Sequence, residues 1–138
     1  MVDPIGALVA WLRAAVPLGE LVEGRVYGGE LPREQVGAMP RPAVVLRPAG
    51  GGLFGRAYQE VGDVRVDVDC YGSVPLEAWQ VYLAAYEALK HLRREVVVGV
   101  LLHCATPSSK GVLARDPDTN WPVCLSSYQL LAAEVPAA

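Results

Sequence analysis

The chain is poor in cysteine and has none of the spacings that give cysteines a shared role. Its 138 residues include three cysteines, Cys70, Cys104 and Cys124, and no CxxC or similar pair. This scarcity excludes a disulfide framework, and the scattered positions exclude a cysteine-based metal site. We interpret all three as reduced core residues of a cytosolic protein.

Long apolar runs and a basic charge excess are also missing. The longest apolar run, 96–102, contains Gly99 and falls far short of the roughly 20 residues that cross a bilayer. The N-terminus lacks the charged and apolar regions of a signal peptide. We therefore expect neither secretion nor membrane insertion. The net charge of -3 and a pI near 5.3 argue against a free-standing nucleic-acid binder, which carries a basic face.

What the sequence does contain is one well-marked strand followed by a helix, in residues 61–92. Along VGDVRVDVDCYG the apolar residues Val64, Val66, Val68 and Cys70 alternate with polar ones, which predicts a strand with one buried face. Ser73, the predicted N-cap, and Pro75 then begin a helix that can cover that face. A chain of this length buries roughly two-thirds of its unfolded surface, so we expect one domain over 1–138.

The other predicted elements complete a small α/β domain. They are a helix over 4–15, a strand within 21–28, a loop over 30–42, a strand over 43–47, a glycine-rich tip over 49–55, a returning strand over 57–71, a strand over 96–102 covered on both faces, a long loop over 107–121 and a last strand over 123–133. The predicted fold class is α/β (α+β): one two-layer domain with a mostly antiparallel or mixed sheet, a long hairpin and two main helices.

The predicted helix after Ser73 is apolar around most of its circumference. Its polar residues form one narrow stripe that includes Glu77, Gln80 and Glu87. The apolar arc is wider than one sheet contact requires, so the pattern predicts a second partner. The candidates for a subunit interface are Leu76, Trp79, Leu83, Tyr86, Val81 and Leu89.

The sequence offers no convincing active site. Asp67 and Asp69 have a spacing that can hold a divalent metal or form a catalytic carboxylate pair, but no His or Glu completes it. We interpret them, with Arg65, as a polar sheet face. His103 and Cys104 are adjacent in a strand and are expected to point to opposite faces. The glycine-rich segment AGGGLFGR lacks a phosphate-loop ending. We expect no enzyme activity, cofactor or metal.

The order of these elements resembles that of phage tail terminators, the tail-completion proteins of long-tailed phages and related gene-transfer particles. The resemblance rests on the first helix, the VY strand with its downstream Leu31-Pro32, PAVVLRP, RVDVDCYG and the EAWQVYLAAYEAL helix. It implies a structural virion protein at the tail–head junction, assembled in the host cytoplasm. Such proteins form a homo-oligomeric ring, a hexamer, which caps the tail tube, stops its polymerisation and joins the head connector or stopper.

The resemblance also suggests roles for particular residues. Arg65, Asp67 and Asp69 are expected to face a neighbouring subunit or the channel through which DNA passes as cargo. The candidates for partner-binding loops are Leu53, Phe54, Arg56, Lys110, Arg115, Asp116 and Asp118. No membrane partner is implied.

Two alternatives remain open at this point. Another neck component, an adaptor or a stopper, would share the ring and the partners, but we expect it to be mainly helical or a β-barrel. A small metal- or thiol-dependent enzyme would need Asp67, Asp69 or Cys104 exposed in a pocket.

Overall fold

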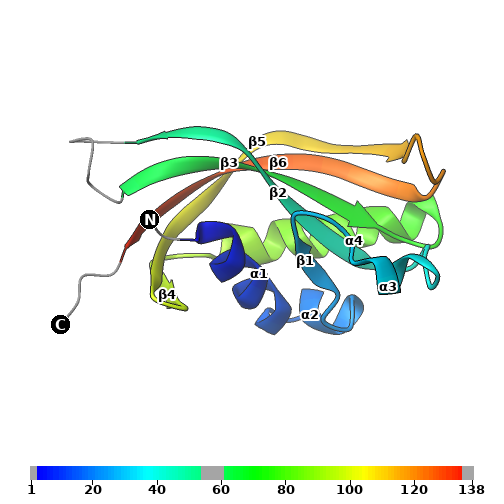
Figure 1. Cartoon of the computed structure of the whole chain (residues 1–138), viewed down its shortest axis with the longest axis horizontal. Helices are drawn as coiled ribbons and strands as arrows, with labels where there is room; N and C mark the ends of the chain where they lie inside the picture. The colour runs from blue at the N-terminus through cyan, green and yellow to red at the C-terminus, as the bar shows by residue number, and fades with distance from the viewer. Residues whose placement is uncertain (1–2, 54–60, 135–138) are drawn as a thin grey trace.

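The computed structural model describes residues 3–53 and 61–134 and confirms the predicted α/β class (Figure 1). In chain order the elements are α1 (Pro4–Ala14), α2 (Leu18–Leu21), β1 (Val26–Gly28), α3 (Arg33–Val36), β2 (Ala43–Leu53), β3 (Val61–Tyr71), α4 (Pro75–Lys90), β4 (Glu95–Val97), β5 (Val100–Arg115) and β6 (Pro122–Glu134). Asp3 caps α1, as its sequence predicts, by accepting a hydrogen bond from the Gly6 N–H at 2.9 Å.

The strands form one six-stranded sheet in the order β1-β2-β3-β6-β5-β4. The pair β1–β2 is parallel and the other neighbours are antiparallel. Two long hairpins, β2–β3 and β5–β6, make up most of the sheet, and β3 pairs with β6 between them. Figure 1 shows the C-terminal end of β2 and the turn between β5 and β6 at opposite ends of the molecule.

Helices α1, α2 and α4 lie on one face of this sheet (Figure 1), and the main core lies between the two layers. The alternation predicted for β3 is confirmed, because Val66, Val68 and Cys70 are buried in that core. On the opposite face a smaller cluster covers one end of the sheet. It consists of Ala43, Val45, Tyr71 and Val123, against which Tyr27, Leu31, Met39, Ala114 and Trp121 pack. The rest of that face carries mainly polar side chains, with Val112 and Leu125 among them.

The glycine-rich segment is strand where the sequence predicted a hairpin tip. Strand β2 continues through Gly50 and Gly51 to Leu53, with Gly51 opposite Val64. A shift in register between Pro48 and Gly51 absorbs the irregular backbone, and Gly50 adopts a φ of 102° there. Backbone pairing with β3 therefore outweighs the entropic cost that glycine brings to a strand.

The apolar run 96–102 is a tight hairpin and not a single strand covered on both faces, so that prediction was wrong. Val97 pairs with Val100, and the two residues between them, Val98 and Gly99, have φ angles of 51° and 75°. Positive φ at both central positions is what a two-residue hairpin turn requires. Val96 and Val98 are 60% and 79% exposed, whereas Val100 and Leu102 are buried, so only the part of the run near the turn lies at the surface.

The predicted long loop over 107–121 is mostly strand. Strand β5 continues to Arg115, and only the turn before β6 is irregular. In that turn the Asp116 carboxylate accepts hydrogen bonds from the N–H groups of Asp118, at 2.9 Å, and Thr119, at 3.3 Å. Three register shifts between β5 and β6 break the alternation of apolar and polar residues. The strand was missed because its sequence lacks that alternation.

The N-cap of helix α4 lies one residue after the predicted Ser73. The N-cap is Val74, and the backbone N–H and hydroxyl of Ser73 both donate to Glu77 Oε1, at 2.8 and 2.6 Å. These hydrogen bonds lower the pKa of Glu77. Glu77, in place of an N-cap side chain, therefore connects the first turn of α4 to the preceding residue Ser73 by hydrogen bonds.

Candidate assembly surface

Helix α4 is covered by its own chain on one side and left open on another. Its buried residues are Ala78, Val81, Tyr82, Ala85 and Leu89. Val81 and Leu89, which the sequence suggested as interface residues, belong to the core of the subunit and have no surface to offer a neighbour. Leu76 and Leu83 are 66% and 44% exposed, and Trp79 and Tyr86 are half-buried beside them.

A groove runs between this open side of α4 and strand β5. One hollow of about 600 Å³ is lined by α4 residues that include Trp79, Leu83 and Tyr86, and by β5 residues 107–111. A second hollow of about 500 Å³ is lined by Tyr86, Lys90, Arg93, residues 103–107 and Tyr128. Because Tyr86 and Pro107 line both, the two hollows adjoin, and we call them together the α4–β5 groove.

The groove is open because the outer edge of β5 is largely unpaired. Strand β4 covers β5 only over Val100–Leu102, and within 3–53 and 61–134 no other strand pairs with that edge. Pro107 and the three register shifts interrupt the edge, features that discourage the addition of a further strand. The groove is therefore better suited to bind side chains of a partner protein than to accept a partner's strand paired to β5.

Exposed large apolar side chains gather around this groove and its hairpin. In the described part of the chain Val74, Leu76 and Leu83 lie at the N-cap and in the first half of α4. The outer half of the β5–β6 hairpin adds Leu113, and also Val112 and Leu125, which line a hollow with Arg65 and Asp67 on the other face of the sheet. A second set, Val16, Leu21 and Val36, lies on the N-terminal segment, and Val96 and Val98 lie at the β4–β5 turn. Exposed apolar side chains beside a groove, as Leu83 is here, are typical of a protein-interaction site.

His103 and Cys104 both border the second hollow, although their adjacency predicted opposite orientations. The reason is local, since a register shift between Leu102 and Cys104 interrupts the alternation of side chains there. Among residues 3–53 and 61–134, no three His, Cys, Asp or Glu side chains are grouped so that they could hold a metal ion. No helix in those residues is long and apolar enough to cross a membrane.

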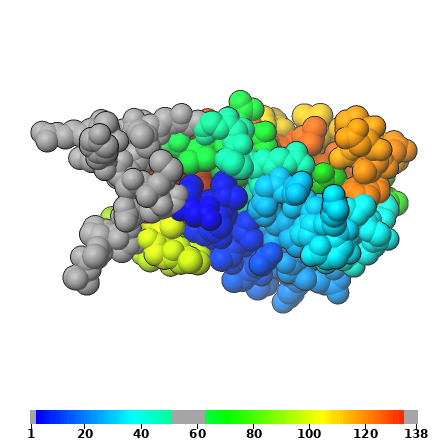
Figure 2. All heavy atoms as spheres, in the orientation of Figure 1, coloured from blue at the N-terminus to red at the C-terminus, as the bar shows by residue number. Residues whose placement is uncertain are grey.

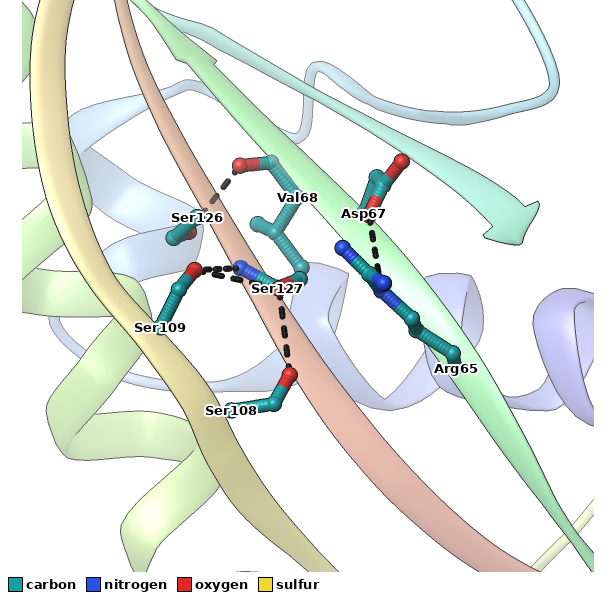
Figure 3. Close-up of polar contacts among 7 residues, drawn as sticks. All are labelled: Arg65, Asp67, Val68, Ser108, Ser109, Ser126 and Ser127. Carbon is teal, nitrogen blue, oxygen red and sulfur yellow. Dashed lines mark hydrogen bonds and ion pairs between the residues drawn. The ribbon is translucent and has the colours of Figure 1, made fainter. Parts of the chain in front are cut away.

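The polar face of β3 lies on the side of the sheet away from the helices. Arg65 and Asp67 are half-exposed neighbours there, with Arg65 Nε 3.7 Å from Asp67 Oδ1. Beside them the Ser127 hydroxyl of β6 lies 3.0 Å from the hydroxyls of both Ser108 and Ser109 of β5 (Figure 3). Arg65 and Asp67 offset each other's charge and the hydroxyls bond to one another, while the exposed side chains of Val112 and Leu125 border the same hollow.

Asp69 differs from its neighbours on that face because it is buried. Its carboxylate makes an ion pair of 2.8 Å with Arg47 of β2, which is half-exposed. Burial raises the pKa of Asp69 above its ordinary value, and Arg47 opposes part of that rise. Asp69 therefore has a structural role in joining β2 to β3 and is not available to a neighbouring subunit.

Replacing Arg47 by Met should destabilise the subunit more at about pH 7 than at about pH 4. Without the guanidinium, Asp69 at neutral pH is a buried, unpaired carboxylate, which costs about 1–3 kcal/mol of unfolding free energy. Because the pKa of Asp69 is higher in the native state than in the unfolded state, the native state binds more protons between those two pKa values. The free energy of unfolding therefore falls as the pH rises through that range. Urea unfolding at both pH values measures the difference. Arg65→Met is the matched control, and an equal loss at both pH values for Arg47→Met would contradict this explanation.

The candidate loop residues lie at two separate places. Leu53 ends β2, and Phe54 and Arg56 lie outside the described residues. Arg115, Asp116 and Asp118 lie at the β5–β6 turn, at the opposite end of the molecule in Figure 1. Lys110 lines the α4–β5 groove and belongs with that surface. Sequence reasoning missed Lys90, Arg93 and Pro107, although Lys90 lies four residues after Tyr86 and so continues the side of α4 formed by Leu83 and Tyr86. Arg93 lies beyond the end of the helix, where no such spacing applies.

The fold and the groove thus define a small α/β domain whose main helix is only partly covered by its own chain. No family model matches the sequence, and no curated protein matches it. Among solved structures, a chain from the virion of a native gene transfer agent particle is 17% identical and aligns over 96% of this chain and 99% of its own, with a TM-score of 0.71. The bacteriophage SPP1 gp17 protein is 20% identical over 95% of this chain and 87% of its own, with a TM-score of 0.48. The first alignment shows a shared fold over nearly the whole of both chains.

Proposed function

We propose that the protein is a structural subunit of a phage-like tail and acts as a tail terminator. In this role copies of the chain form a closed ring, a hexamer, on the last ring of tail-tube protein. The ring stops polymerisation of the tube and gives the head connector or stopper a surface to bind. Its place is then the tail–head junction of the virion, and its function is assembly and not catalysis.

The observation that carries this proposal is the open side of α4 along the α4–β5 groove. A monomer gains nothing from leaving Leu76 and Leu83 in water, whereas a neighbouring copy can bury them. The whole-length fold shared with a chain of a gene transfer agent particle supports an assembly role. The mixed α/β content favours a terminator over an adaptor or stopper, which we expected to be mainly helical or a β-barrel.

The two hairpin ends suit the two different partners of a terminator. The C-terminal end of β2 and the β5–β6 turn lie at opposite ends of the molecule (Figure 1). In a ring, one end can meet the tail tube while the other meets the connector. We propose the region of Leu53, and Arg115, Asp116 and Asp118 at the turn, as these two contact regions.

We further propose that the polar face of β3 borders the DNA channel or a neighbouring subunit. Asp67 is an accessible carboxylate of this face, whereas Asp69 is buried. Asp67→Lys should leave the ring intact and slow DNA passage, because an added cation binds the phosphate backbone of the cargo. The measurement is infectivity, or gene transfer, of particles that carry the variant. Normal delivery by such particles would count against a channel position for this face.

The proposed function is tested by adding the purified chain to growing tail tubes of its own particle. We expect the tubes to stop at a defined length, each with a ring of this protein at one end in electron micrographs. A protein that leaves tube growth unchanged and is absent from tube ends would overturn the proposal. Leu76→Asp is a suitable inactive control, since it places a charge on the open side of α4.

A further inference from the structure

We propose that neighbouring copies join head to tail, with the α4–β5 groove of one copy receiving the α2–α3 surface of the next. By the α2–α3 surface we mean Glu20, Leu21, Glu30, Glu34 and Val36, which are exposed on and between α2 and α3. This inference rests on the proposed ring and names the two halves of its subunit contact. Three observations support it: the opposite charges of the two surfaces, the exposed apolar side chains on both, and their positions at opposite edges of the sheet.

The groove has a basic end and a basic rim, which no acidic side chain of residues 3–53 and 61–134 neutralises through an ion pair. Lys90 and Arg93 line the second hollow and Lys110 lines the first, while no acidic residue is among those that line either hollow. In the described part of the chain these three cations have no ion-pair partner. The nearby carboxylate of Glu87 lies on the outer stripe of α4, 3.7 Å from His91 Nε2. The groove is therefore complementary to carboxylates.

The α2–α3 surface has the opposite charge. Glu23 is already paired with Arg25 at 2.8 Å, so it adds no free charge to this surface. What remains between α2 and α3 is Glu20, Glu30 and Glu34 against the single guanidinium of Arg33. None of these three glutamates has an ion-pair partner in the residues the structure describes. Three free carboxylates thus match the three free cations of the groove.

Both surfaces also carry apolar side chains next to their charges. Leu21 and Val36 are 36% and 44% exposed on the α2–α3 surface. The first hollow of the groove offers Trp79, Leu83 and Tyr86 to receive them. An aromatic and aliphatic centre with charged residues at its rim is the usual composition of a stable protein interface.

The topology places the two surfaces on opposite flanks of the subunit. Strand β1, which α2 and α3 flank in Figure 1, is one edge of the sheet, and the groove follows β5 near the other edge. Figure 2 shows the N-terminal segment, in blue to cyan, forming much of the face turned to the viewer. A contact between two different flanks is heterologous, and repeated contacts of that kind form a ring when the rotation from one copy to the next closes.

A charge-swap experiment on the full chain tests this contact. Lys90→Glu/Arg93→Glu should weaken ring formation roughly tenfold at low salt, and Glu30→Lys/Glu34→Lys should do the same, because each places like charges across the joint. Combining all four substitutions in one chain should restore assembly, since the charges are then complementary again. The control Gln80→Glu/Arg94→Glu adds negative charge at two exposed residues that line neither hollow of the groove, and it should assemble normally. Native mass, at about 50 and 500 mM salt, alone and on tail tubes, gives the ring fraction, and circular dichroism checks the fold.

The outcomes separate this contact from the proposed function. Loss in each double variant with rescue in the fourfold variant supports the head-to-tail joint. Rings that form equally well in the wild type and in both double variants would overturn the joint and leave the ring proposal intact. A fourfold variant that fails to assemble although folded also overturns it. A wild-type chain that forms no ring, alone or on tubes, would overturn both.

Discussion

Leu83→Arg is expected to abolish ring formation and to leave the subunit folded. Leu83 is 44% exposed in the subunit and lines the first hollow of the α4–β5 groove. In a ring a neighbour would cover it, so the substitution buries an unpaired guanidinium in an apolar contact. A central contact residue of this kind contributes about 2–4 kcal/mol, which is a loss of roughly 30-fold or more in association. Native mass spectrometry measures the ring fraction, and circular dichroism reports whether the helix remains.

The control for this variant is Gln80→Arg on the same helix. Gln80 lies on the exposed polar stripe of α4 and lines neither hollow of the groove. An arginine there has the same size and charge but stays in water, so rings should form as in the wild type. If both variants assemble equally well, the open side of α4 is not the subunit contact.

Gly72→Ala is expected to cost about 3 kcal/mol of unfolding free energy, at the upper end of the usual range for overpacking. A Cβ at this position would lie 2.3 Å from the backbone nitrogen of Ala78 and 2.7 Å from the carbonyl carbon of Glu77. These are backbone atoms of the first turns of α4, so the helix itself would have to shift. Because Gly72 connects β3 to α4, the shift would also move the open side of the helix. Thermal unfolding should show a decrease in melting temperature of about 10 °C.

Gly37→Ala provides the comparison for this effect. No atom lies within 4 Å of the position that a Cβ would take at Gly37, and its φ is -66°. The alanine should therefore change the melting temperature little. Similar behaviour of the two variants would contradict the close approach of the β3–α4 connection to the helix.

The unit formed by β3 and α4 could be predicted because both of its signals are local. Alternation of Val64, Val66 and Val68 shows a strand with one buried face, and the spacing along α4 shows a helix with too much apolar surface. The sequence could not tell which apolar side of α4 the sheet covers. That choice depends on tertiary packing, and it placed Val81 and Leu89 in the core while leaving Leu76 and Leu83 exposed.

The C-terminal half of the sheet was harder to predict because its signals are interrupted. In β5 the register shifts break the period of two, so the segment resembles a loop until its pairing with β6 is known. In the run 96–102 the turn at Val98 and Gly99 lies inside a continuous apolar stretch and has only one glycine to mark it. The groove between α4 and β5 depends on both features, which is why only its α4 side could be predicted.

The most direct test of the account is the native mass of the full chain together with electron micrographs of tail tubes to which it has been added. The account predicts a closed ring of identical subunits at one end of each tube and no further growth from that end. A chain that remains monomeric in the presence of the tubes, with tubes that continue to lengthen, would contradict it.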